Sequence, residues 1–157
     1  MTCYHVLDIE AIKNKELIKF FFNAQSKVLN LTWDKYIRFI FTDETLDITF
    51  IELFEEDFDF ETCFLKYSII NFKNKNILIF QHPAGAEISY AEGQTLYMTN
   101  NTINHNASTL PGSSGYALIL KNGENRVIGI HKSGNNYSRL NQVTPFTTGL
   151  IEKNKRF

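Results

Sequence analysis

Cysteine and proline are scarce in this chain, and neither positive nor negative charge is in large excess. Its 157 residues include two cysteines (Cys3 and Cys63), three prolines, and 16 basic against 17 acidic residues. Two cysteines are too few for the disulfide framework of a small secreted domain, so we expect both to be reduced thiols. A net charge of −1 offers no clustered basic face, and we therefore expect neither nucleic acid nor a membrane surface as a partner.

Long apolar runs are missing too. No run approaches the ~20 residues that cross a membrane, and Met1 is not followed by a basic and then an apolar leader. We accordingly expect a cytoplasmic protein. The length suits one domain or two small lobes and is sufficient to bury a core.

Short β-prone runs separated by polar breaks dominate what is present. Runs at this spacing predict an all-β protein built as a barrel or sandwich rather than alternating β and α units. The predicted N-terminal elements are a short helix over 8–15 and strands over Leu17–Asn23, Lys27–Thr32, Tyr36–Thr42 and Asp47–Leu53. The predicted C-terminal strands are Ile77–Gln81, Glu87–Ala91, Gln94–Thr99, Thr102–His105, Tyr116–Lys121, Arg126–Lys132 and Leu140–Thr144. A short helix over Thr147–Lys155, with Thr147 or Thr148 near its cap, is predicted to follow them.

The polar, lysine-bearing stretch Asn71–Asn76 is interpreted as a linker. It divides the chain into an N-terminal lobe over 1–76 and a C-terminal lobe over 77–157. In the second lobe, Asn122-Gly123 between two apolar runs is a strong hairpin signal. Some six short antiparallel strands there predict a small closed barrel, which leaves no exposed sheet edge.

A tight turn of small residues, Pro111-Gly112-Ser113-Ser114-Gly115, precedes the apolar run Tyr116–Leu120. Its glycines let the backbone bend sharply and approach a ligand, so the turn exposes one hydroxyl. It also directs the N–H groups of Gly112, Ser113 and Ser114 into one concavity that can hold an oxyanion. The alternative is a purely structural turn, which is common for such short patterns.

Hydrolysis by a serine also needs an imidazole and a carboxylate. His5 ends an apolar run just before the chain turns, and Asp47 opens a run of alternating apolar residues. Each also has an ordinary interpretation: a solvent-facing or satisfied histidine, and a turn or cap aspartate. The remaining histidines are His82, His105 and His131.

Taken in chain order, these segments resemble those of trypsin-like (chymotrypsin-fold) serine endopeptidases, in the disulfide-free branch that includes glutamyl endopeptidases. Thr2–Leu7 is similar to the family's segment around its histidine, and Asp47–Leu53 to that around its aspartate. Pro111–Gly115 resembles the nucleophile turn, and Val127–Gly134 the strand that flanks the bound substrate. The resemblance implies two antiparallel β-barrel lobes.

It further implies a catalytic triad of Ser114 as nucleophile, His5 as general base and Asp47 as orienting carboxylate. The oxyanion hole would consist of the Gly112 and Ser114 N–H groups, and the backbone of Lys132, Ser133 and Gly134 would pair with substrate as an added strand. Thr109 and His131, with Ser108 as a further wall residue, match the specificity pocket of the glutamyl branch. Hydrogen-bond donors there favour Glu, or secondarily Gln or Asp, before the scissile bond.

The chain also departs from the family pattern. Strands that precede the family's histidine have no counterpart here, so we expect an incomplete N-terminal barrel that is rebuilt or completed by an upstream segment or partner. Tyr116 stands where a small residue is usual, and its ring either crowds the nucleophile or packs inward. Ser113 replaces an aspartate, so activation by N-terminal cleavage is not expected.

The function predicted is peptide-bond hydrolysis of protein or peptide substrates. The alternative is a catalytically weak or inactive module that binds extended peptides or a protein partner. We expect no metal or organic cofactor, because Cys3 and His5 lie close together in the sequence without further ligands and no phosphate-cradling glycine loop precedes a helix.

Overall fold

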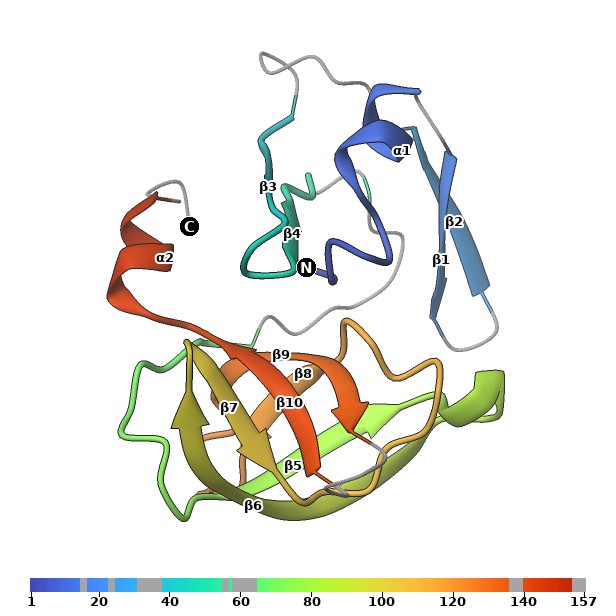
Figure 1. The fold of residues 1–157 in the computed structure, drawn as a ribbon. Helices are drawn as coiled ribbons and strands as arrows, with labels where there is room; N and C mark the ends of the chain where they lie inside the picture. The colour runs from blue at the N-terminus through green and yellow to red at the C-terminus, as the bar shows by residue number, and fades with distance from the viewer. Residues whose placement is uncertain are drawn as a thin grey trace. The chain divides into compact units, whose positions relative to one another are not determined.

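The computed structural model, drawn in Figure 1, describes residues 1–14, 17–22, 25–30, 38–54, 57, 65–135 and 140–153. Strands dominate these residues, as the predicted all-β class requires. The chain divides into two compact units, one of Met1 and Cys3–Phe64 and the other of Thr2 and Leu65–Phe157. Within the described ranges, no helix has the length and apolar character needed to cross a membrane.

The first unit contains antiparallel hairpins, and its described residues form separate two-stranded sheets rather than a closed barrel. Its order is α1 (Ile9–Lys13), β1 (Leu17–Phe22), β2 (Gln25–Asn30), β3 (Ile40–Asp43) and β4 (Ile48–Ile51). β1 pairs with β2, and β3 pairs with β4. This matches the expectation of an incomplete N-terminal lobe. The C-terminal end of the strand predicted over 27–32 lies outside the described residues, and so does the start of the strand predicted over 36–42.

A small core fixes the start of the first unit. Leu7 and Ile12 are buried, and Ile40 and Ile51 of the β3–β4 hairpin pack against them. Asp8 caps α1 by accepting a hydrogen bond from the Ala11 N–H at 2.8 Å, which satisfies one of the helix's free donors. The chain around residues 5–8 is thereby held against β3 and β4.

The second unit contains the predicted closed barrel, with strand order β10-β7-β6-β5-β8-β9 (Figure 1). Every neighbouring pair is antiparallel, so the backbone groups of each strand are satisfied on both sides and no edge is left along the paired segments. The strands are β5 (Asn76–Gln81), β6 (Ser89–Thr99), β7 (Thr102–His105), β8 (Ala117–Leu120), β9 (Val127–Asn135) and β10 (Leu140–Pro145).

Branched aliphatic side chains fill the barrel. Ile77 and Ile79 of β5 alternate inward and are fully buried, as the period of two in a strand requires. They pack with Leu118, Ile128 and Val143 in one cluster. Burial of each such side chain contributes about 1.5–3 kcal/mol, so this cluster stabilises the barrel substantially.

Two tight turns close the hairpins of the barrel. Asn100 and Asn101 both adopt positive φ, 47° and 61°, which fits a two-residue turn between β6 and β7, where Thr99 pairs with Thr102. Gly123 also has a positive φ, 86°, in the turn from β8 to β9. The hairpin predicted from Asn122-Gly123 is therefore confirmed.

One predicted break is wrong. Glu92-Gly93 does not separate two strands, because β6 runs unbroken from Ser89 to Thr99. Gly93 instead allows a close approach: a Cβ built there would lie 2.4 Å from the backbone nitrogen of Ala107 and 2.6 Å from its Cα. Asn106 is held alongside by its N–H, which donates to the Gln94 carbonyl at 3.2 Å.

The boundary between units differs from the predicted one at 76/77, because residues 65–75 belong to the second unit. Tyr67 forms a parallel bridge with Val127 of β9, and the Ser68 N–H donates to the Val127 carbonyl at 2.8 Å. Ile70 and Phe72 pack against the barrel core. The polar stretch after them is a turn that leads into β5.

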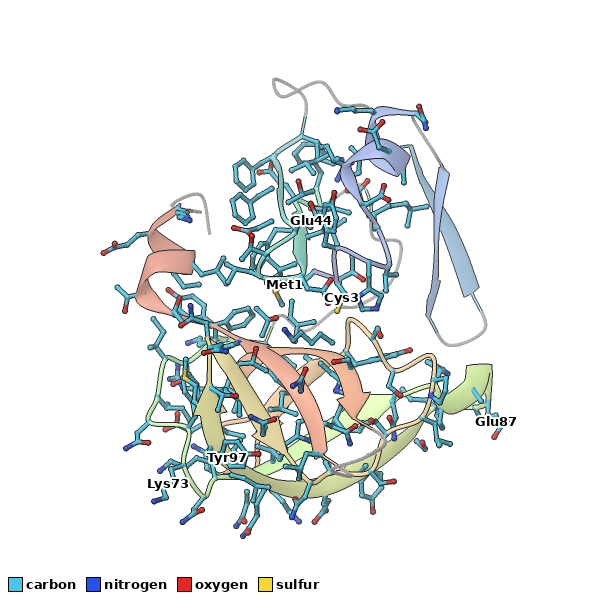
Figure 2. All side chains as sticks on the ribbon, viewed as in Figure 1. Met1, Cys3, Glu44, Lys73, Glu87 and Tyr97 are labelled. Atoms are coloured by element: carbon cyan, nitrogen blue, oxygen red, sulfur yellow. The ribbon has the colours of Figure 1, made fainter. Side chains whose placement is uncertain are left out.

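Charged and aromatic side chains lie on the outside of the second unit, and a short helix follows its last strand. Lys73, Glu87 and Tyr97 project outward (Figure 2). After β10 comes α2 (Thr148–Lys153), where the Thr147 hydroxyl accepts from the Leu150 N–H at 3.2 Å as an N-terminal cap. The cap agrees with the predicted one, and the last residues of the predicted helix lie outside the described part of the chain.

Candidate active site

The serine turn lies between β7 and β8 in the second unit. Gly112 and Gly115 adopt positive φ of 94° and 89°. Residues with a Cβ adopt this conformation only with steric strain, so glycine is favoured at both positions. The Pro111 carbonyl accepts a hydrogen bond from the Ala84 N–H at 2.7 Å. Since the N–H and C=O of a peptide point in opposite directions, this bond turns the Gly112 N–H away from Ala84.

The turn uses its three N–H groups differently from the initial expectation. The Ser113 N–H donates to the Leu110 carbonyl at 3.2 Å, so it closes the turn and does not face a ligand. The N–H groups of Gly112 and Ser114, the pair predicted for the oxyanion hole, have no hydrogen-bond acceptor among the described residues.

Gln81 is a positioning residue that the sequence analysis missed. It ends β5 on the inward face and is 5% exposed, and its Oε1 accepts from the Ser113 hydroxyl at 2.6 Å. Its Nε2 donates to the Ser108 carbonyl at 3.1 Å. One buried amide therefore holds both the serine turn and the loop before it. The sequence did contain a signal for this role: Gln81 is polar at a position where the alternation of Ile77 and Ile79 predicts an inward-facing apolar residue.

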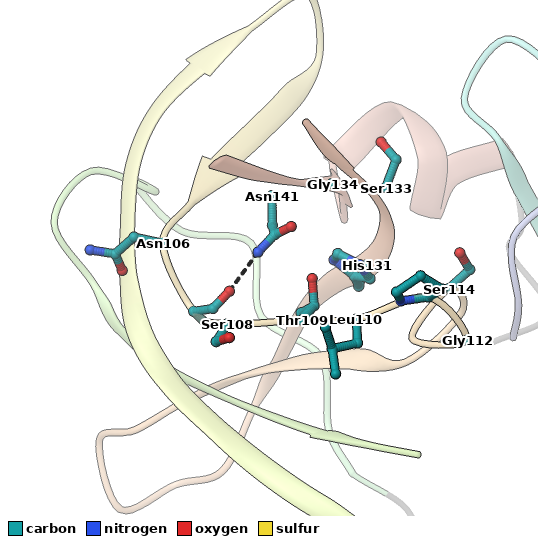
Figure 3. A pocket seen from close by; sticks show the side chains of 12 residues that line it. Asn106, Ser108, Thr109, Leu110, Gly112, Ser114, His131, Ser133, Gly134 and Asn141 are labelled. Carbon is teal, nitrogen blue, oxygen red and sulfur yellow. Dashed lines mark hydrogen bonds between the residues drawn. The ribbon is translucent and has the colours of Figure 1, made fainter. Parts of the chain in front are cut away.

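A pocket of about 530 Å³ opens beside Ser114 (Figure 3). Asn141 braces its wall by donating from Nδ2 to the Ala107 carbonyl at 2.6 Å, drawn as the dashed line. The twelve described residues that line it include no Asp or Glu. They are Asn106, Ala107, Ser108, Thr109, Leu110, Pro111, Gly112, Ser114, His131, Ser133, Gly134 and Asn141. The structure thus brings together Thr109, His131, Ser133 and Gly134, predicted from separate stretches of the chain.

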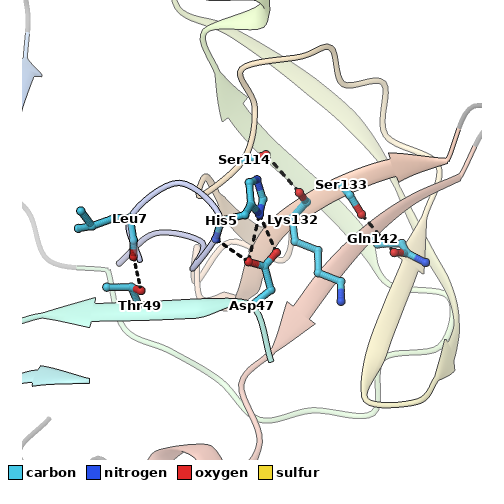
Figure 4. Close-up of polar contacts among 8 residues, drawn as sticks. All are labelled: His5, Leu7, Asp47, Thr49, Ser114, Lys132, Ser133 and Gln142. Carbon is cyan, nitrogen blue, oxygen red and sulfur yellow. Dashed lines mark hydrogen bonds and ion pairs between the residues drawn. The ribbon is translucent and has the colours of Figure 1, made fainter. Parts of the chain in front are cut away.

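The remaining predicted substrate segment lies on an overhang of β9. β8 pairs with β9 only as far as Ala117 opposite Ile130, whereas β10 pairs with β9 as far as Asn135. The His131 N–H donates to the Tyr116 carbonyl at 2.8 Å. Past this residue, Ser133 and Gly134 have a ladder partner on one side among the described strands, and Lys132 lies at a shift in the β9–β10 register with no residue of β10 opposite it. The Ser114 hydroxyl donates to the Lys132 carbonyl at 3.1 Å (Figure 4). Ser133 donates to Gln142 Oε1 at 3.2 Å.

Two histidines meet inside the barrel behind the pocket. His105 Nε2 lies 3.4 Å from His131 Nδ1, and the rings are edge to face with centroids 5.6 Å apart. Burial, with the nearby His131 as a smaller cause, lowers the pKa of His105 to about 3. His105 is therefore a neutral imidazole at ordinary pH. Its Nδ1 is buried with no hydrogen-bond partner among the described residues.

Tyr116 packs inward, one of the two alternatives weighed from the sequence. Its side chain contacts the barrel core cluster, and its ring centroid lies 6.0 Å from that of His82. Burial raises the pKa of the Tyr116 hydroxyl. The ring is therefore a partly buried residue that covers the barrel core.

The first unit brings His5 and Asp47 together across 42 positions of sequence (Figure 4). His5 Nδ1 lies 2.9 and 3.0 Å from the two carboxylate oxygens of Asp47, and the His5 backbone N–H donates to Oδ1 at 3.0 Å. Asp47 has a positive φ of 54° in the turn before β4, a conformation that Asp tolerates better than most residues. The Thr49 hydroxyl donates to the Leu7 carbonyl at 2.8 Å, which ties the His5 turn to β4.

These features define a class of protein: a chymotrypsin-fold peptidase domain, with a closed barrel that carries a serine turn and a pocket, and a hairpin unit that carries a histidine–aspartate pair. The family model for the trypsin-like peptidase domain matches residues 1–130. The chain belongs to this family. A search of curated protein sequences finds no match.

Solved structures agree on the fold. The serine endoprotease from Yersinia pestis is 16% identical with a TM-score of 0.68 over 97% of this chain and 50% of that one. The Rv3671c protease from M. tuberculosis, active form, is 13% identical with a TM-score of 0.68 over 97% and 65%. A catalytically inactive tobacco etch virus protease complexed with substrate is 15% identical with a TM-score of 0.66 over 96% and 68%. The chain thus spans half the length of the Yersinia pestis protease.

Proposed function

We propose that this chain is a serine endopeptidase that hydrolyses peptide bonds through Ser114, His5 and Asp47. The observation that carries the proposal is the His5–Asp47 pair, with Nδ1 2.9 Å from the carboxylate. A carboxylate at Nδ1 holds the proton there and leaves Nε2 as the base, which is the tautomer that acyl transfer by a serine needs. A histidine that was merely exposed would need no such partner.

In the proposed reaction the Ser114 hydroxyl attacks the scissile carbonyl and its proton passes to His5 Nε2. The tetrahedral oxyanion accepts hydrogen bonds from the Gly112 and Ser114 N–H groups, which bond to no other described residue. The imidazolium then gives its proton to the leaving amine, and water hydrolyses the acyl-enzyme by the same steps. Substrate backbone pairs with the free side of residues 132–134 as an added strand.

A fluorophosphonate probe tests the nucleophile. Wild-type protein is expected to be labelled covalently, and Ser114→Ala to lose both labelling and at least about 10³-fold of any peptidase rate. Ser89→Ala, on the exposed face of β6, is the matched control and should label like the wild type. Folded wild-type protein that binds peptides without Ser114-dependent labelling would favour the alternative module, whose binding needs only the β9 overhang.

We further propose a preference for Glu, then Gln or Asp, before the scissile bond. The pocket beside Ser114 offers the imidazole of His131 and the hydroxyl of Thr109, and its described lining carries no carboxylate to pair with Lys or Arg. A carboxylate or amide oxygen of the substrate would accept hydrogen bonds from these two groups, whereas an apolar side chain would leave the buried His131 donor without a partner from the substrate.

Cleavage of a peptide library measures this preference. His131→Leu is expected to lower kcat/KM for Glu substrates by about 10²-fold or more relative to Leu substrates, because the hydrogen bond to the substrate oxygen is lost. A wild-type profile dominated by Lys, Arg or large aromatic residues would refute the preference while leaving the serine mechanism intact.

A further inference from the structure

A thiol, an imidazole and a carboxylate converge in the first unit. The sulfur of Cys3, a ring nitrogen of His5 and a carboxylate oxygen of Asp47 all lie within 4.8 Å of one another. Cys3 is buried, the Asp47 side chain is 21% exposed, and the His5 side chain is 49% exposed. Solvent therefore reaches the cluster at the His5 side chain and does not reach Cys3. The sequence alone suggested no third ligand for Cys3 and His5.

The backbone holds these three groups in place. The Cys3 carbonyl accepts from the N–H groups of Val6 at 3.2 Å and Leu7 at 3.1 Å, which fixes the turn that carries both Cys3 and His5. The Asp47 carboxylate accepts from the His5 N–H at 3.0 Å, which fixes Asp47 against the same turn. Ligands held in this way lose little conformational entropy when an ion binds.

The ligand chemistry selects zinc. Thiolate, imidazole and carboxylate are the three side-chain ligands of Zn²⁺, with bonds of about 2.3, 2.0 and 2.0–2.2 Å. Tetrahedral coordination at these lengths separates ligand atoms by roughly 3.5 Å, and side-chain rotations within the 4.8 Å cluster reach it. Three protein ligands leave the fourth position for water, on the side where His5 is exposed.

We propose that Cys3, His5 and Asp47 bind Zn²⁺ and that bound zinc inhibits the peptidase, the second half resting on the proposed function. On binding, the Cys3 thiol releases its proton to solvent and ligates as thiolate. Zn²⁺ takes the place of the proton on His5 Nδ1, and the neutral imidazole carries that proton on Nε2 instead, where it can no longer accept one from Ser114. The imidazole is then a metal ligand and the carboxylate no longer orients it. Both changes remove the general base, so hydrolysis stops until the ion is withdrawn.

Cobalt binding tests the site without relying on activity. Co²⁺ is titrated into the Ser114→Ala protein, and the thiolate-to-cobalt charge-transfer band in the near ultraviolet is followed. Cys3→Ser is expected to abolish the band, and Asp47→Asn to weaken Co²⁺ binding at least tenfold. Cys63→Ser is the matched control and should keep the band. A band that survives Cys3→Ser in folded protein, or that is lost with Cys63→Ser, would overturn the site.

Inhibition is measured on the protein with Ser114 intact. Micromolar Zn²⁺ is expected to block fluorophosphonate labelling and peptide cleavage, with recovery on adding a chelator, and Cys3→Ala should raise the half-inhibitory Zn²⁺ concentration at least tenfold. Full activity at saturating Zn²⁺ would refute inhibition and leave the metal site standing. Chelated protein that neither labels nor cleaves would refute the proposed function, and inhibition with it, whereas the cobalt result would still decide the site.

Discussion

Acid is expected to destabilise the C-terminal barrel through His105. This imidazole is fully buried, and burial lowers its pKa to about 3 from an ordinary 6.5. Because the unfolded chain binds a proton at this position below pH 6.5 and the folded barrel does not, the stability present above pH 6.5 is lost as the pH falls towards 3. Each pH unit in this window costs 1.36 kcal/mol for one such group, so the loss between pH 6.5 and 4.5 is about 3 kcal/mol.

Urea unfolding at pH 7.5 and 4.5, followed by far-ultraviolet circular dichroism, measures this loss. His105→Gln carries no titrating group and is expected to lose about 3 kcal/mol less than wild type between the two pH values, whatever its stability at pH 7.5. His82→Gln, at an exposed histidine, is the matched control and should behave like wild type. Equal pH dependence in His105→Gln and wild type would refute a neutral, buried His105.

Two further substitutions test the packing of each unit by urea unfolding. Gly93→Ala should lower the free energy of unfolding by about 2–3 kcal/mol, because its Cβ would lie 2.4 Å from the backbone nitrogen of Ala107. Gly149→Ala in α2 is the control: its Cβ would have nothing within 4 Å, and the substitution should raise the free energy of unfolding by up to about 1 kcal/mol. Equal effects of the two substitutions would contradict the close approach at Gly93. Arg38→Met should cost about 3–5 kcal/mol by leaving Asp57, 2.7 Å away and 11% exposed, without its cation, and a loss below about 1 kcal/mol would contradict a buried pair.

Local signals in the sequence predicted what is locally determined. The Asn122-Gly123 turn, the strand over Ile77–Gln81 and the cap of α2 all depend on a few neighbouring residues, and all are found in the structure. The resemblance to trypsin-like peptidases supplied the other residues of the candidate site, since residues as distant as His5 and Asp47 carry no local sign of their pairing. Their contact at 2.9 Å depends on the fold of the whole first unit.

Features that depend on distant contacts escaped the sequence analysis. Gly93 was predicted to break a strand because glycine occurs both in turns and where two backbone segments approach closely. Only the position of Ala107 in the fold shows that Gly93 belongs to the second case. Tyr67 joins the barrel through Val127, sixty positions away. His105 lies two residues after Ile103 of the core cluster, so the period of two in β7 places both side chains on the inward face. The sequence analysis did not apply this period to so short a strand.

In the free protein the Ser114 hydroxyl rests in a hydrogen bond to the Lys132 carbonyl at 3.1 Å. As a nucleophile it would first have to leave this rotamer, and one hydrogen bond of about 0.5–1.5 kcal/mol slows that departure by roughly two- to tenfold. A bound peptide strand whose N–H donates to the Lys132 carbonyl would compete with the Ser114 hydroxyl for that acceptor and weaken the hydrogen bond of the hydroxyl. Occupation of the β9 overhang and readiness of the serine therefore rise together in the proposed enzyme.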